Sequence, residues 1–150
     1  MKKLFFTLAL LFSVSMAYSQ WTYERVDNGF DEPYKIAYTK VNNDCILKLE
    51  NVNGEIAFYI QGGYFCDEEP LVEMSFLVGS EYHKFYAYGT TGDDSKVVFI
   101  MDDITGSNIL ADFKNCSILK IRITDDICDD EIFNFNMTHS TSAYNYMLKQ

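Results

Sequence analysis

The densest group of potential ligands in the chain is a run of acidic residues around one cysteine. It comprises Asp125, Asp126, Asp129, Asp130 and Glu131. Hard cations such as Ca²⁺ take six to eight oxygen ligands, and neighbouring carboxylates can supply several of them. The spacing and the central glycine of an EF-hand loop are absent. A solvated acidic turn that discourages aggregation is therefore the preferred interpretation, and a calcium site is the alternative.

Two histidines, His83 and His139, carry the side chains best suited to acid–base catalysis near neutral pH. Either could be oriented by a carboxylate in a hydrolase site, because catalytic triads assemble in space rather than along the sequence. The chain has no G-x-S-x-G nucleophile motif, no phosphate-binding loop and no dinucleotide-binding motif. Packing or surface roles are therefore preferred for both histidines, and a His/carboxylate hydrolase is the alternative.

Three tyrosines, Tyr82, Tyr86 and Tyr88, share one face of an expected strand over residues 81–88, together with Lys84. A tyrosine offers a large apolar ring with a polar tip, so an exposed row can stack on sugar rings or anchor a protein partner. The same row would be core if it faced a second sheet, and this interpretation is favoured on general burial preferences. The row is nevertheless the best candidate for recognition in this chain.

Four cysteines, Cys45, Cys66, Cys116 and Cys128, predict two disulfides in an oxidising compartment, with three possible pairings. Cys45 begins one arm of an expected hairpin and Cys66 lies just past the other arm. Both should lie at the end away from the turn, where their Cα atoms can approach within about 7 Å. We therefore expect Cys45–Cys66, and Cys116–Cys128 follows only as the complement. A free, buried cysteine is the alternative.

The N-terminal segment has the composition of a secretory signal peptide. The basic start Met1-Lys2-Lys3 precedes an apolar run, and Ala17-Tyr18-Ser19 supplies small residues for cleavage. The run is shorter than the ~20 residues of a transmembrane helix, and no cysteine follows it as in a lipoprotein. We expect a signal peptide over residues 1–19 and a single domain over residues 20–150, secreted or periplasmic.

The chain is strongly acidic, with a formal net charge of −10 that becomes −12 once the two leader lysines are removed. Such a charge repels phosphate backbones and anionic lipids, so nucleic acid and membrane-surface binding are not expected. It favours cationic partners or divalent cations, although solubility alone also explains it. No segment after the leader is apolar for long enough to insert into a membrane.

Short aromatic and β-branched stretches alternate with clusters of Gly, Asn and Asp, which is the pattern of many short strands. Two short helices are expected after Ser107 and at Ser140 or Thr141, where a hydroxyl can cap the first turn. The sequence therefore predicts a mainly all-β domain, an antiparallel β-sandwich or partly open barrel with two short helices, one of them C-terminal. The expected strands are residues 21–26, 34–40, 45–50, 55–60, 71–78, 81–88, 96–101, 117–123 and 132–137.

The clearest local signal is a hairpin around Asn53-Gly54, a dipeptide that readily adopts the positive φ values of a tight turn. A two-residue turn places Leu49 opposite Phe58 and Leu47 opposite Ile60. These four side chains would form one apolar face, because side chains alternate between the two faces of a strand.

The layout from Leu71 onward resembles that of small secreted β-sandwich accessory proteins of type VI secretion, the TagO-like group. The resemblance implies a β-sandwich fold. No functional residue carries over, because the arginine-containing central segment of that group is absent and the chain's two arginines are Arg25 and Arg122. The matching elements are Phe113-Lys114, residues 119–123, residues 133–137 and the small-residue helix start at residues 140–143.

Three functional hypotheses follow. The leading hypothesis is an exported, non-enzymatic β-sandwich that binds a partner protein or glycan through an edge strand or its aromatic face. The acidic charge would speed encounter with a cationic partner. The alternatives are a small secreted hydrolase that uses His83 or His139, and a calcium-dependent adhesion module that uses the Asp125–Glu131 turn.

Overall fold

The structure is a computed structural model that describes residues 21–27, 29, 33–41, 45–52, 55–92, 97–100 and 109–148. The expected signal peptide lies outside these residues. Within them, no helix is both long enough and apolar enough to cross a membrane.

One antiparallel sheet contains five strands in the order β1-β2-β3-β4-β7. Its β3–β4 pair has the predicted register, with Leu47 opposite Ile60 and Leu49 opposite Phe58. All four side chains are buried, which confirms the apolar face expected of this hairpin, while Asn53-Gly54 lies outside the described residues. The strands are β1 (Thr22–Val26), β2 (Tyr34–Lys40), β3 (Ile46–Val52), β4 (Glu55–Gln61) and β7 (Val97–Ile100).

The second antiparallel sheet has the order β6-β5-β8-β9. Its strands are β5 (Leu71–Val78), β6 (Glu81–Thr91), β8 (Cys116–Thr124) and β9 (Glu131–Asn136). Buried and exposed side chains alternate along β8 from Leu119 onward and along β9, which shows that one face of this sheet is covered and the other is open.

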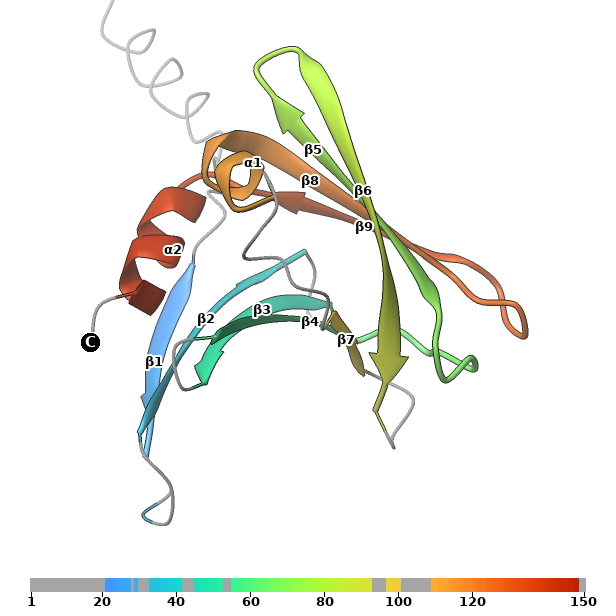
Figure 1. Ribbon diagram of the computed structural model, residues 1–150, viewed down its shortest axis with the longest axis horizontal. Coiled ribbons are helices and arrows are strands. Elements are labelled where there is room, and N and C mark those ends of the chain that lie inside the picture. Colours follow the sequence, from blue (N-terminus) through green and yellow to red (C-terminus); the bar gives the residue numbers. More distant parts are fainter. Residues whose placement is uncertain are drawn as a thin grey trace, which may run out of the picture.

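Strand β6 belongs to both sheets. Residues 81–88 pair with β5, whereas Gly89, Thr90 and Thr91 pair with β7. Figure 1 shows the two sheets as layers that meet along this side of the molecule. The strand order starts at β1 and ends at β9, and these two strands do not pair, so the sandwich is not a closed barrel.

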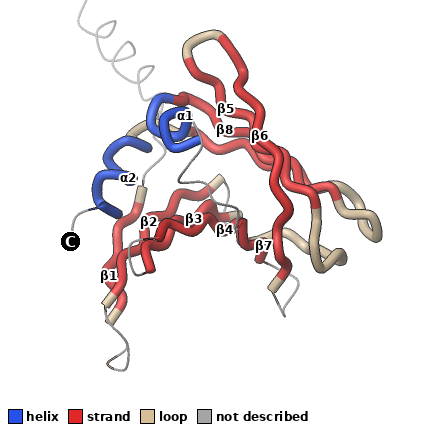
Figure 2. Tube along the Cα trace, in the orientation of Figure 1, coloured by secondary structure: helices blue, strands red, loops and turns tan. Residues whose placement is uncertain are grey.

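Two short helices, α1 (Ile109–Asn115) and α2 (Ser140–Leu148), pack against each other on the side away from β7 (Figure 2). Phe113 of α1 is fully buried, and its ring packs edge-on against Phe58 at 5.5 Å and Trp21 at 5.9 Å. This aromatic cluster joins α1 to β4 and to the residue that precedes β1. The sequence expectation of a β-sandwich with two short helices, one C-terminal, is thus confirmed, although the expected cap Ser107 lies outside the described residues.

Candidate functional site

The tyrosine row of β6 is exposed. Tyr82, Tyr86 and Tyr88 have 46%, 53% and 70% of their surface open to solvent. The favoured interpretation of this row as core is therefore wrong. On the opposite face of the strand Ala87 is buried and Phe85 packs against the core, so β6 turns these two side chains to the sandwich interior and its tyrosines outward.

The pairing of β6, β5 and β8 places charged side chains beside these rings. Opposite Lys84 stand Ser75 and then Lys120, and opposite Tyr86 stand Glu73 and then Arg122. Ile132 of β9 pairs with Arg122 and extends the row of Tyr86, Glu73 and Arg122 across the sheet. We call this surface the tyrosine–lysine face; it comprises Tyr82, Lys84, Tyr86, Tyr88, Glu73, Ser75, Lys120, Arg122 and Ile132.

Glu73 is the acid around which the cations of this face gather. Its carboxylate accepts a 2.6 Å hydrogen bond from Nζ of Lys84, and Nη1 of Arg122 lies 3.8 Å away. The hydrogen bond from Lys84 is the main reason why the pKa of Glu73 is lowered from its ordinary value. Nζ of Lys120 stands 4.9 Å from the centre of the Tyr82 ring, a cation–π distance.

The face is cationic although the chain is acidic. Lys84, Lys120 and Arg122 contribute three positive charges, and Glu73 contributes one negative charge. A hollow of about 280 Å³ lies among them, bordered also by Tyr82 and by Ile132. The small side chain of Ser75, between two lysines, leaves this space open.

The outer face of the first sheet also carries tyrosines, a lysine and acids, but there these side chains contact one another. Lys48 stands 4.7 Å above the Tyr59 ring and pairs with Glu50 at 3.1 Å. Burial, and then Glu50, raise the pKa of Tyr59 to about 12. The hydroxyl of Tyr38 donates to Glu24 at 3.0 Å. The rings of Tyr38 and Tyr59 are half-buried, whereas the three tyrosines of β6 are exposed.

Asp125, the first residue of the acidic run, acts as a backbone clamp. Its Oδ2 accepts hydrogen bonds from the N–H groups of Cys66 and Asp67, and its Oδ1 accepts from Ile127 and Cys128. Burial alone would raise the pKa of Asp125, but these four donors outweigh it and lower the pKa to about 2.

The structure does not gather the five acids into a cation site. The neighbours Asp126, Asp129 and Asp130 are exposed. In the described part of the chain, the potential ligand atoms that meet within 4.8 Å belong to Asp125, Cys66 and Cys128. The two sulfurs of that group are joined in a disulfide, and a metal requires free thiolates. The clamp role of Asp125 therefore accounts for this cluster.

The predicted disulfide pairing is wrong. Cys66 is bonded to Cys128, with their Cα atoms 5.8 Å apart, whereas Cys45 and Cys116 are buried and form no disulfide. The alternative of a buried cysteine outside any disulfide thus holds for two residues.

The long-range pairing of β5 with β8 explains the difference. Leu71 at the start of β5 stands opposite Thr124 at the end of β8. The residues before Leu71 therefore run beside those after Thr124, and this brings Cys66 to Cys128. The chain reaches this junction through Gly62, whose φ of 108° suits glycine.

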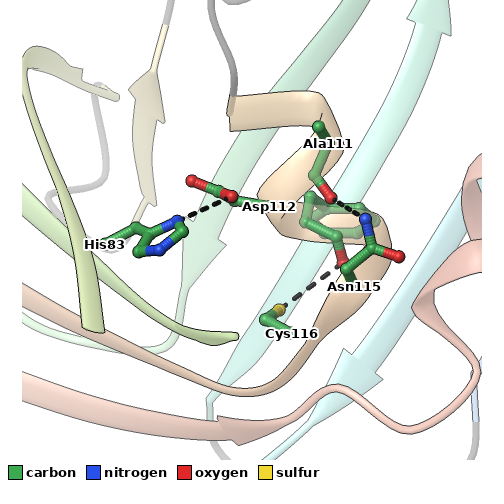
Figure 3. Close-up of polar contacts among 6 residues, drawn as sticks. His83, Ala111, Asp112, Asn115 and Cys116 are labelled. Carbon is green, nitrogen blue, oxygen red and sulfur yellow. Dashed lines mark hydrogen bonds and ion pairs between the residues drawn. The ribbon is translucent and has the colours of Figure 1, made fainter. Parts of the chain in front are cut away.

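The histidines lie in different surroundings. Nδ1 of His83 lies 2.9 Å from Oδ1 of Asp112 on α1 (Figure 3). The thiol of Cys116, four residues after Asp112, donates a hydrogen bond to the carbonyl of Phe113 at 3.5 Å, and burial raises its pKa to about 12. A thiol with such a pKa does not supply a nucleophilic thiolate. The exposed His139 has a φ of 69°, and its carbonyl accepts the first hydrogen bonds of α2.

We expect the His83–Asp112 pair to hold α1 against β6 only weakly. The side chains are 44% and 19% exposed, and pairs of this kind contribute about 0–1 kcal/mol. A double-mutant cycle with His83→Ala and Asp112→Asn, followed by urea unfolding, should give a coupling below ~1 kcal/mol. A coupling of ~3 kcal/mol would assign the pair a much larger structural role.

The sequence matches no protein-family model and no curated relative. Among solved structures, invasion associated protein B from Bartonella henselae has a similar fold, with a TM-score of 0.58 and 12% sequence identity. The match covers 87% of this chain and 93% of that chain. At this level of identity the likeness concerns the fold, and it supports the arrangement of two packed antiparallel sheets.

Proposed function

We propose that this protein is an exported, non-enzymatic β-sandwich that binds its partner through the tyrosine–lysine face. The observation that carries the proposal is the exposure of Tyr82, Tyr86 and Tyr88 in one row beside three cationic side chains. Exposed aromatic rows next to arginine are typical of binding surfaces, because large rings and guanidinium groups contribute most per residue.

Export is supported by two features. The first 19 residues have the pattern of a signal peptide, and the Cys66–Cys128 disulfide is compatible with an oxidising compartment. We place the mature protein in the periplasm or outside the cell.

Binding is favoured over hydrolysis by the surroundings of the histidines. The hollow beside Ser75 and the second hollow beside Phe65 are lined by neither His83 nor His139. His83 has an acid at hydrogen-bond distance, but the thiol of Cys116, four residues after that acid, is kept neutral by burial. We therefore assign the His83–Asp112 pair to holding α1 against β6 rather than to catalysis.

The test compares tyrosines on and off the face. Immobilised wild-type protein, a variant with Tyr82, Tyr86 and Tyr88 changed to serine, and a Tyr64→Ser variant would be exposed to cell-envelope extract. Tyr64 is 63% exposed and lies outside the face, so it controls for loss of an exposed ring. We expect proteins and glycans retained by the wild type and by Tyr64→Ser to be lost from the triple variant. Identical retention by all three proteins would contradict the proposal.

A further inference from the structure

We infer that the tyrosine–lysine face binds a carbohydrate that carries carboxylate groups, of the uronic acid class. This inference rests on the proposed function, because it assigns a ligand chemistry to the same surface.

The tyrosine rings of β6 are spaced for contact with successive sugar units of an oligosaccharide. Residues two apart on one face of a strand are separated by ~7 Å, and those four apart by ~14 Å. Tyr86 and Tyr88 thus present neighbouring rings, and Tyr82 presents a third farther along β6. Among the described residues, no hydrogen bond engages the hydroxyl of Tyr86 or Tyr88. These rings remain available for stacking against the faces of sugar rings, which are apolar on one side.

The charges of the face suit a carboxylate. Arg122 is 52% exposed and lies 3.8 Å from Glu73, so most of its donors point to solvent. Lys120 meets a tyrosine ring rather than an acid in the described part of the chain. Both groups border the hollow beside Ser75, and a ligand carboxylate there would gain charge-assisted hydrogen bonds from them.

The overall negative charge does not cancel this local preference. The Debye length is ~8 Å at physiological ionic strength, so charges beyond this distance are largely screened. The exposed acids at Asp126, Asp129 and Asp130 follow the far end of β8, beyond Thr124. Lys120, four positions earlier on that strand, lies ~14 Å from that end, beyond the Debye length, whereas Arg122, two positions earlier, lies ~7 Å from it. A ligand in the hollow therefore meets mainly the cations.

Glu73 distinguishes a sugar from an acidic peptide. An ionised carboxylate only accepts hydrogen bonds, so Glu73 repels the side chains of an acidic peptide and gains nothing from them. A sugar offers hydroxyl donors to Glu73 and a carboxylate to the neighbouring cations. An extended peptide, moreover, binds to a sheet edge, where unpaired backbone groups are available, whereas the hollow lies over β5 and β8, which have a strand on either side.

The hollow is small enough to be selective. Its volume of about 280 Å³ falls just below the ~300 Å³ at which pockets for small molecules begin. It would take one charged sugar unit, while the tyrosines of β6 contact the units on one side of it.

Isothermal titration calorimetry in 0.15 M salt would test the inference with three probes of matched length. The probes are trigalacturonic acid, its methyl ester, and a triglutamate peptide blocked at both ends. We expect measurable binding of trigalacturonic acid, at least tenfold weaker binding of the neutral ester, and no measurable binding of the peptide. Equal affinities of acid and ester would overturn the assignment of a carboxylate ligand, and preferential binding of the peptide would make the ligand an acidic protein segment.

Variants locate the binding. Ser75→Tyr fills the hollow and leaves every charge and ring in place, and the Lys120→Gln/Arg122→Gln pair removes the two cations. Each is expected to weaken trigalacturonic acid binding at least tenfold. Lys48→Gln is the matched control, since Lys48 also stands above a tyrosine and beside an acid but lies on the other sheet. The Lys48→Gln variant should bind trigalacturonic acid as tightly as the wild type does. Circular dichroism should show that all variants fold.

The outcomes separate this inference from the proposed function. Absence of trigalacturonic acid binding, with retention from envelope extract still lost in the tyrosine variant, overturns the ligand class and leaves the binding face intact. Trigalacturonic acid binding that is unaffected by Ser75→Tyr and by the cation variants overturns this inference, because the sugar would then bind elsewhere.

Discussion

Replacing Cys66 and Cys128 together by serine is expected to lower the free energy of unfolding by about 4 kcal/mol. The disulfide spans 62 residues, and a crosslink that closes a long loop removes much conformational freedom from the unfolded chain. It also fastens the segment before β5 to the turn after β8, which are far apart in sequence. Loss of 4 kcal/mol is a large fraction of the 5–15 kcal/mol typical of a folded domain.

Urea unfolding with and without dithiothreitol measures this effect. Reductant should destabilise the wild type to the level of the double serine variant and leave that variant unchanged. A double serine variant as stable as the oxidised wild type, or one that reductant still destabilises, would show that the bond between Cys66 and Cys128 is not the stabilising one.

Thiol titration provides an independent check. Burial, with smaller contributions from nearby acids, raises the pKa of Cys45 and of Cys116 to about 12. Neither thiol should react with Ellman's reagent in the folded protein, and two should react in denaturant without reductant. Complete absence of reactive thiols in denaturant would indicate a second disulfide instead.

Asp125→Ala is expected to cost about 3–5 kcal/mol, comparable with removal of the disulfide. The substitution leaves four backbone N–H groups without their ionised acceptor, two of them on the disulfide cysteines. Asp125→Asn should also destabilise, because its amide nitrogen cannot accept two of these hydrogen bonds. Asp126→Asn is the matched control, since Asp126 is the exposed neighbour and its change should stay within ~0.5 kcal/mol.

The pH dependence gives the clamp a distinct signature. Asp125 has a pKa of about 2 in the folded protein, below its ordinary value of 3.8. A lowered folded pKa adds stability that is present above pH 4 and is lost as the pH falls toward 2. The shift corresponds to about 2 kcal/mol. The stability difference between wild type and Asp125→Asn should therefore shrink by this amount between pH 5 and pH 2, and a constant difference would argue against an ionised clamp.

The positions and faces of the strands follow from local patterns. β2 and β5 have the predicted bounds, Tyr34–Lys40 and Leu71–Val78. The hairpin register of β3 and β4 also follows, because a two-residue turn and the twofold alternation of side chains allow one pairing of the apolar faces.

The tyrosine–lysine face illustrates the limit of such patterns. Alternation places Tyr82, Lys84 and Tyr86 together on β6, but it does not say whether that face turns inward. The lysine among the tyrosines was the available signal for an outward face, since an unpaired lysine is almost never fully buried. Glu73 and Arg122 were not predicted as members, because their proximity requires β5 to lie between β6 and β8.

The sequence by itself determined where the strands lie and which side chains share a face, because those properties depend on residues close together along the chain. Tertiary structure alone decided that the tyrosines point to solvent, that Cys66 meets Cys128, and that Asp125 clamps the backbone beside them. These features depend on the pairing of Leu71 with Thr124 and on the passage of β6 between two sheets. Such long-range pairings are selected by burial of the whole core, and no local pattern encodes them.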